Sequence, residues 1–168
     1  MKVFKAFMIV IVLLIVVLPA CATGTGDTKK SVGVGVEKKT KESLMEIQTA
    51  VRDVLDGLVD AYVNKNARRF MSFVAEDYAG DDTILDRRIR RDFRKFSDMD
   101  MRYTFNNVTT DSKNENISVA VTFTRSYTDV KTAKRINKPG SAVLIFRMVD
   151  GHPKLREMKR PSLFILGK

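Results

Sequence analysis

The chain has 168 residues, of which 44% are hydrophobic, and its 30 Lys and Arg against 20 Asp and Glu give a formal charge of +10. This composition fits a single domain with a buried core rather than a disordered chain, and the single cysteine leaves no partner for an internal disulfide. The positive charge favours anionic partners but does not choose between nucleic acid, lipid headgroups and acidic polysaccharide.

Residues 1–20 have the three parts of a secretion signal. Lys2 and Lys5 make a positive start, Phe7–Leu18 is an uninterrupted apolar run, and small residues follow. The run is shorter than the roughly 20 residues needed to cross a bilayer, and its length is typical of a signal-peptide core. A permanent N-terminal anchor helix is the alternative, because Ala6–Gly26 carries no charge.

The signal is followed by the chain's one cysteine. Leu18-Pro19-Ala20-Cys21 resembles the lipobox of bacterial lipoproteins, whose cysteine receives a diacylglycerol and becomes the mature N-terminus. Pro19 departs from that pattern, and Ala20-Cys21-Ala22 also fits ordinary signal peptidase. An exported protein would otherwise carry an oxidisable thiol here, so we expect Cys21 to be lipidated. The resemblance implies membrane lipid as a partner and a bacterial cell-envelope location, with Ala22 permitting transport to an outer membrane facing the periplasm.

Residues 21–42 are expected to be the lipidated cysteine and a flexible tether. The segment is rich in Gly and Lys and has no aromatic residue, so it cannot bury enough apolar surface to order itself. Its lysines either keep the linker soluble or lie on anionic headgroups.

The folded domain is predicted to span 43–168 and to begin with three helices. Ser43 and Glu46 form a capping box, and apolar residues then recur at helical spacing to about Asn64. A second helix fits Ala67–Ala75, and a third fits about 83–97. The apolar stripe of the third helix consists of Leu85, Ile89, Phe93 and Phe96.

After Asp98 the apolar period changes from 3.6 to 2, which predicts strands. Alternating runs lie at about 101–105, 117–127, 141–149 and 154–159, and Lys138-Pro139-Gly140 and Asp150-Gly151 are turn signals. Three helices followed by an antiparallel meander predict an α+β fold, with the helices packed on one face of a curved antiparallel sheet.

This order resembles the NTF2-like superfamily, the cone fold of SnoaL and ketosteroid isomerase, over Leu44–Leu163. The residues that carry the resemblance are the long first helix, Phe93-x-x-Phe96-Ser97-Asp98 before the first strand, and Phe146-Arg147-Met148-Val149-Asp150-Gly151-x-x-Lys154-Leu155 near the end. Pro153 stands where members commonly have Trp. The resemblance implies a cavity between sheet and helices, used by some members for catalysis or ligand binding, and dimerisation through the sheet in others.

One candidate site is a basic face on the third helix. Helical spacing places Arg87, Arg90, Arg91 and Arg94 opposite the apolar stripe, where guanidinium groups could bind phosphate or carboxylate of an anionic envelope component. The alternative is a solvated face partly neutralised by Asp86 and Asp92. Nucleic acid is not expected, since no aromatic platform interleaves the charges.

A second candidate is a ligand pocket inside the cone. Its polar groups would be Tyr62, Tyr103, Arg125 and Tyr127, and the alternative is an aromatic core with hydroxyls at its rim. No acid aligns with the isomerase base, so no catalytic residue is assigned. His152, the only histidine, is expected to be exposed in a hairpin turn, and neither a metal site nor a cofactor is predicted.

These features predict a lipid-anchored envelope protein whose NTF2-like domain binds or assembles with another component. The alternatives are a SnoaL-like isomerase or hydrolase acting on a small apolar ligand, and a structural homodimer. An acid within hydrogen-bond reach of a Tyr in the cone would favour the enzyme. A cone filled by side chains would favour the binding module.

Overall fold

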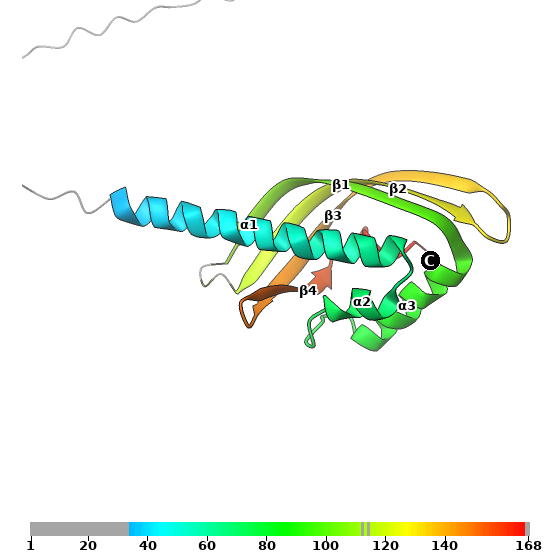
Figure 1. The fold of residues 1–168 in the computed structure, drawn as a ribbon, viewed down its shortest axis with the longest axis horizontal. Coiled ribbons are helices and arrows are strands. Elements are labelled where there is room, and N and C mark those ends of the chain that lie inside the picture. The colour runs from blue at the N-terminus through cyan, green and yellow to red at the C-terminus, as the bar shows by residue number, and fades with distance from the viewer. Residues whose placement is uncertain (1–33, 112, 114, 167–168) are drawn as a thin grey trace, which may run out of the picture.

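Three helices pack against a four-stranded sheet in the computed structural model, which describes residues 34–111, 113 and 115–166, with side chains from Ser43 on. The predicted signal peptide and Cys21 lie outside the described residues. No helix in the described part is long and apolar enough to cross a membrane. The elements are α1 (Val34–Val63), α2 (Ala67–Ser72), α3 (Asp82–Lys95), β1 (Phe96–Thr110), β2 (Asn116–Asp129), β3 (Arg135–Val149) and β4 (His152–Met158) (Figure 1).

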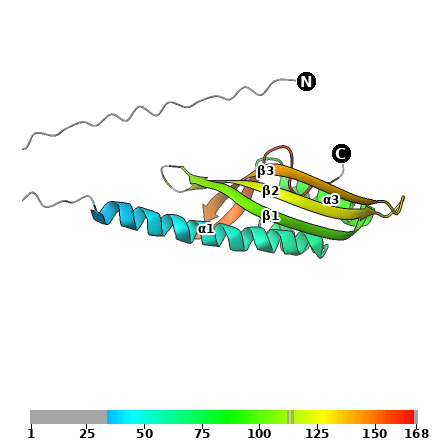
Figure 2. The same cartoon turned by 90° about the horizontal axis from the view of Figure 1, so that it is seen from above.

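The sheet is an antiparallel meander in the order β1-β2-β3-β4. The pairing of β1 with β2 shifts register between Ser97 and Asp100 and again between Phe105 and Asn107, and such irregularities bend a strand. The curved sheet wraps around the helices, and α1 runs alongside β1 (Figure 2). The predicted α+β class, with three helices on one curved antiparallel sheet, is confirmed.

Helix α1 begins at Val34, nine residues before the predicted start at Ser43. The last nine residues of the predicted tether, 34–42, are therefore helical rather than coil. Lys and Glu have high helix propensity, and extending an existing helix avoids the cost of nucleating a new one. At 30 residues α1 is about 45 Å long, and its N-terminal part extends beyond the sheet (Figure 1).

Two further boundaries differ from the prediction. Strand β3 runs through Pro139 and Gly140, which were expected to form a turn. Because β4 pairs only with the second half of β3, Pro139 lies on an edge where its missing N–H costs no ladder bond. Gly140 lies under the ring of Phe123, whose nearest atom would be 2.6 Å from a Cβ at that position.

Helix α2 ends at Ser72 instead of Ala75, because the following residues pair with the sheet. The Ala75 N–H donates to Leu155 O, and the Leu155 N–H donates to Phe73 O. This short parallel contact covers part of the β4 edge.

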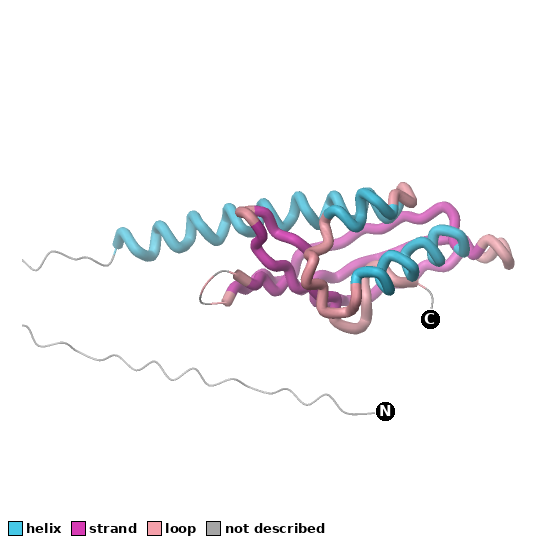
Figure 3. Tube along the Cα trace, turned by 90° about the horizontal axis from the view of Figure 1, so that it is seen from below, coloured by secondary structure: helices cyan, strands magenta, loops and turns pink. Residues whose placement is uncertain are grey.

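The core lies between the helices and the concave face of the sheet. Its fully buried side chains include Val51, Leu55, Leu58, Tyr62, Phe70, Ile89, Ile117, Leu144, Phe146, Leu155, Leu163 and Phe164. Leu163 and Phe164 follow the last strand. We call residues 162–166 the tail; it has no helix or strand structure and lies beside α3 (Figures 1 and 3).

Candidate functional site

The inward face of α3 carries an acid. Leu85, Ile89 and Asp92 are its buried residues, at the four- and three-residue steps of one helix face. Asp92 was expected on the solvated face, where it would neutralise arginines, but its side chain is completely buried. Phe93, assigned to the apolar stripe, is only half-buried because the helix is rotated toward Asp92.

The Asp92 carboxylate meets a tyrosine inside the cone. The Tyr62 hydroxyl donates to Asp92 Oδ2 at 2.9 Å, and Tyr62 is 1% exposed. Burial, followed by the nearby Asp92 charge, raises the pKa of Tyr62 well above its ordinary value of 10.0. Tyr62 is therefore a neutral hydrogen-bond donor at physiological pH.

A buried cation faces the same interior from β2. Arg125 is 6% exposed, and its Nη1 donates to the main-chain oxygens of Ser162 and Leu163, both at 2.9 Å. Its Nε is buried and has no hydrogen-bond partner within the described residues. Burial lowers the pKa of Arg125, and the charges of Tyr127, Tyr62 and Asp92 oppose that change.

The tail fills the space between these groups. Phe164 packs its ring against Tyr62 at 5.4 Å and against Phe70 at 4.9 Å between ring centroids. The Leu166 N–H donates to Asp92 Oδ2 at 2.7 Å. The acid that a proton-transfer reaction would require is therefore covered by the chain itself.

Three of the four predicted pocket residues come together. Tyr62, Arg125 and Tyr127 are buried and interact electrostatically in the cone. Tyr103 lies elsewhere, with its hydroxyl donating to Asp56 Oδ1 of α1 at 2.6 Å. The interior thus has both an acid bonded to a Tyr, which favours an enzyme, and a filling of side chains, which favours a binding module.

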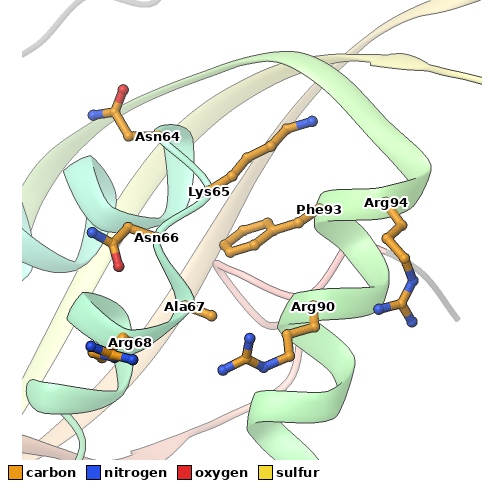
Figure 4. A pocket seen from close by; sticks show the side chains of 8 residues that line it. All are labelled: Asn64, Lys65, Asn66, Ala67, Arg68, Arg90, Phe93 and Arg94. Atoms are coloured by element: carbon orange, nitrogen blue, oxygen red, sulfur yellow. The ribbon is translucent and has the colours of Figure 1, made fainter.

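A second site lies open at the surface, between the α1–α2 turn and α3. This cationic pocket has a volume of about 650 Å³. Arg90 and Phe93 project from α3 toward the turn, and Lys65 extends from the turn toward α3 (Figure 4). Its lining residues are Asn64, Lys65, Asn66, Ala67, Arg68, Arg90, Phe93 and Arg94.

The turn that carries half of this pocket is held by its own backbone. Lys65 adopts a left-handed φ of 56°, and the Asn66 N–H donates back to Ala61 O at 2.8 Å, closing α1. The Asn66 side chain then accepts from the Arg69 N–H at 3.0 Å and caps α2. These bonds fix the backbone of Lys65 and Arg68 at the junction of α1 and α2.

The pocket is positive and accessible. The Arg90 Nε donates to both oxygens of Asp86, at 2.8 and 3.0 Å, which uses one of five guanidinium donors. Lys65, Arg68 and Arg94 are exposed and make no ion pair with other described residues. These three cations are therefore exposed to solvent.

The basic face predicted on α3 is exposed, but only half of it lines this pocket. Arg90 and Arg94 do, whereas Arg87 and Arg91 are exposed elsewhere on the helix. Sequence reasoning missed Lys65, which stands in the short break between two helical patterns, and Arg68, which stands at the start of the second. Two basic residues beside a helix break predict a positively charged turn at the surface.

The remaining predicted features are simpler. His152 is exposed at the start of β4, as expected. No group of three or more His, Cys, Asp or Glu side chains able to hold a metal ion occurs among the residues that the structure describes.

Comparison with known proteins supports the fold and nothing finer. No family model and no curated sequence matches the chain. Among solved structures, a putative scytalone dehydratase from Novosphingobium aromaticivorans aligns with a TM-score of 0.60 and 13% identity, over 77% of this chain and 98% of that one. A ketosteroid isomerase-like protein from Erwinia carotovora atroseptica aligns with a TM-score of 0.56 and 12% identity, over 66% and 91%.

A conserved protein from Planctomyces limnophilus aligns with a TM-score of 0.60 and 14% identity, over 68% of this chain and 94% of that one. At these identities the likeness concerns the fold alone. The chain has the NTF2-like cone fold that the sequence resemblance implied.

Proposed function

We propose that this NTF2-like domain is a binding module of the bacterial cell envelope, anchored to membrane lipid through Cys21, that holds an anionic envelope component in the cationic pocket. The observation that carries the proposal is that Lys65 of the α1–α2 turn, Arg68 of α2, and Arg90 and Arg94 of α3 all line one open pocket. Guanidinium groups bind phosphate and carboxylate through paired hydrogen bonds, so a phosphate- or carboxylate-bearing headgroup or polymer is the matching ligand class.

The half-buried Phe93 adds an apolar wall to this pocket. Its ring packs edge-on against Tyr62 at 5.3 Å, so its orientation is fixed by the core. A ligand with an apolar or sugar-ring portion next to its anionic group fits this wall better than a bare ion does.

The test is co-sedimentation of a soluble chain starting at Val34 with phosphatidylglycerol vesicles and, separately, with acidic wall polymer. We expect binding at low ionic strength that weakens with added salt, because exposed charges are screened within about 10 Å at 0.1 M. Replacing Arg68, Arg90 and Arg94 by Gln should abolish it.

The matched control removes the same charge from the β2–β3 hairpin and strand β3, whose residues do not line the pocket. Lys131, Lys134 and Lys138 are exposed there, and their replacement by Gln should leave binding nearly unchanged. If the two triple variants lose binding equally, the attraction depends on net charge alone, and the proposal of a defined pocket is refuted.

An enzyme of the isomerase or dehydratase class is the second candidate, favoured by the buried Tyr62–Asp92 pair. Such an enzyme would use Asp92 as a base and Tyr62 as a donor to a developing oxyanion. The assay is exchange of α-protons of cyclic ketones in D₂O above the buffer rate. Exchange that disappears in Asp92→Asn would favour this candidate over the binding module.

A further inference from the structure

The tail contacts the helices and the sheet in the way that a separately bound peptide would. It lacks regular structure, yet it touches all the layers of the cone: Phe164 contacts α1 and α2, Leu166 contacts α3, and Ser162 and Leu163 contact β2. Leu163 and Phe164 are both completely buried. A peptide bound from outside would fill the same places.

The contacts of the tail with Arg125 and Asp92 are made by its main chain. Two consecutive carbonyls accept from the Arg125 guanidinium, and an amide N–H three residues further on donates to Asp92. Arg125 and Asp92 therefore contact main-chain groups, and the side chains of Leu163 and Phe164 make the apolar contacts with the core. The tail is bent at Leu163 and Phe164, so the ligand class that matches these contacts is a bent apolar peptide.

Packing alone does not explain the two charged residues. Burying an ionised group is costly, and well-packed apolar residues of similar volume often stabilise a core at least as well. Arg125 also keeps a buried Nε donor that no described residue satisfies, so this cation has capacity for a further acceptor. The Arg125 guanidinium and the Asp92 carboxylate are placed so that they can bind the carbonyl and N–H groups of a peptide backbone.

The tail is also reachable from the surface. A pocket of about 160 Å³ opens beside Ser162 and Ile165, and its other walls include Tyr78 of the α2–α3 loop and Arg88 of α3. An incoming segment can therefore begin to displace the tail at its edge before the buried Phe164 leaves.

We propose that the interior of the cone is a peptide-binding site occupied by the chain's own tail, and that an apolar segment of another protein replaces the tail there in the same bent conformation. The replacing segment places two consecutive main-chain carbonyls at Arg125, an aromatic side chain between Tyr62 and Phe70, and an amide N–H at Asp92. This site is separate from the cationic pocket, so either proposal can fail alone.

A self-bound tail competes with any incoming peptide. The apparent affinity for the peptide is reduced by the fraction of molecules whose site is open. Weakening the tail without changing the cone should therefore increase peptide affinity, whereas weakening the core elsewhere should not.

The experiment uses the full-length chain in mild detergent and a fluorescein-labelled synthetic peptide of residues 162–168, followed by anisotropy. We expect weak binding to the wild type and at least about tenfold tighter binding to Phe164→Ala, whose own tail has lost its anchor. Phe105→Ala is the matched control, a half-buried ring on β1 outside the tail, and should bind as the wild type does.

Two further arms test the chemistry. A peptide in which the residue equivalent to Phe164 is Ala should not bind, and Arg125→Gln added to Phe164→Ala should lose at least about tenfold in affinity. A folded Phe164→Ala chain that binds no peptide at about 1 mM would overturn the proposal. Equal tightening in Phe105→Ala would do the same.

If Phe164→Ala does not fold, Phe164→Leu decides the question by thermal melting. A melting temperature that rises with peptide concentration supports the proposal, because a ligand bound only by the folded state stabilises it. A melting temperature that does not change with peptide overturns it.

Discussion

The cone interior and the cationic pocket both combine arginine with phenylalanine, but their surroundings differ. Arg125 is 6% exposed and is held by main-chain carbonyls, whereas the Arg90 side chain is 53% exposed and paired with a surface carboxylate. A desolvated charge must be satisfied by the protein, so loss of its partner costs stability. A hydrated charge costs the fold little and stays available to a ligand. The interior charges therefore contribute to stability through the tail that satisfies them, whereas the charges of the surface pocket stay available to a ligand without any displacement.

The largest expected difference in stability between the two regions is between substitutions of two acids on α3. Asp92→Ala leaves the Tyr62 hydroxyl and the Leu166 N–H without their acceptor, and should cost about 3–5 kcal/mol of unfolding free energy. Asp86→Ala removes an exposed partner of Arg90 and should cost about 0.5 kcal/mol. Urea denaturation measures both, and similar losses would mean that Asp92 is hydrated.

Two tyrosines give the next contrast. Tyr62→Phe keeps the ring but leaves the buried Asp92 short of one donor, which should cost about 1–3 kcal/mol. Tyr103→Phe removes a more exposed bond to Asp56 and should cost about 1 kcal/mol or less. Thermal melts of the two variants rank them, and the reverse order would contradict the burial assigned to Tyr62.

Alkaline pH tests the same interior without a large structural change. Burial raises the pKa of Tyr62 above its unfolded value of 10.0, so its contribution to stability is complete below pH 10 and is lost as pH rises toward the folded pKa. Unfolding free energy should therefore fall as the pH rises above about 10. The fall should be shallower in Tyr62→Phe, and an unchanged slope in that variant would assign it to other groups.

The smallest expected effect on stability belongs to the surface pocket. The triple Gln variant of Arg68, Arg90 and Arg94 should stay within about 0.5 kcal/mol of the wild type, since exposed charges contribute little to folding. Differential scanning calorimetry at matched ionic strength checks it. A loss of several kcal/mol would show that these arginines hold the α2–α3 corner together, and would remove the separation between the two regions.

Much of the fold followed from local sequence pattern. The three helices and four strands were predicted in order, because a period of 3.6 or 2 reports which face of each element is apolar. Their ends were less accurate. The start of α1 at Val34 and the passage of β3 through Pro139 depend on neighbours that the local pattern does not contain.

The candidate sites were predicted only in part. The exposed arginines of α3 were recognised from their spacing, and Tyr62, Arg125 and Tyr127 lie together in the interior. Their use as a ligand pocket stays a prediction, as does the lipidation of Cys21, which lies outside the described residues. The prediction that Asp92 lies on the solvated face of α3 was wrong, because an acid among several arginines in the sequence is typical of an exposed helix face. Only the position of α3 beside Tyr62 of α1 and the tail shows that Asp92 is buried.

By itself, the sequence determined the order of the elements, the amphipathic faces and the surplus of positive charge. The tertiary structure alone decided that residues 162–166 lie inside the cone, and that Lys65 and Arg68 join Arg90 and Arg94 in one pocket. The reason is physical. Periodicity arises between residues a few positions apart, whereas both sites are assembled by contacts between segments far apart in the chain, and neither burial nor convergence leaves a local pattern.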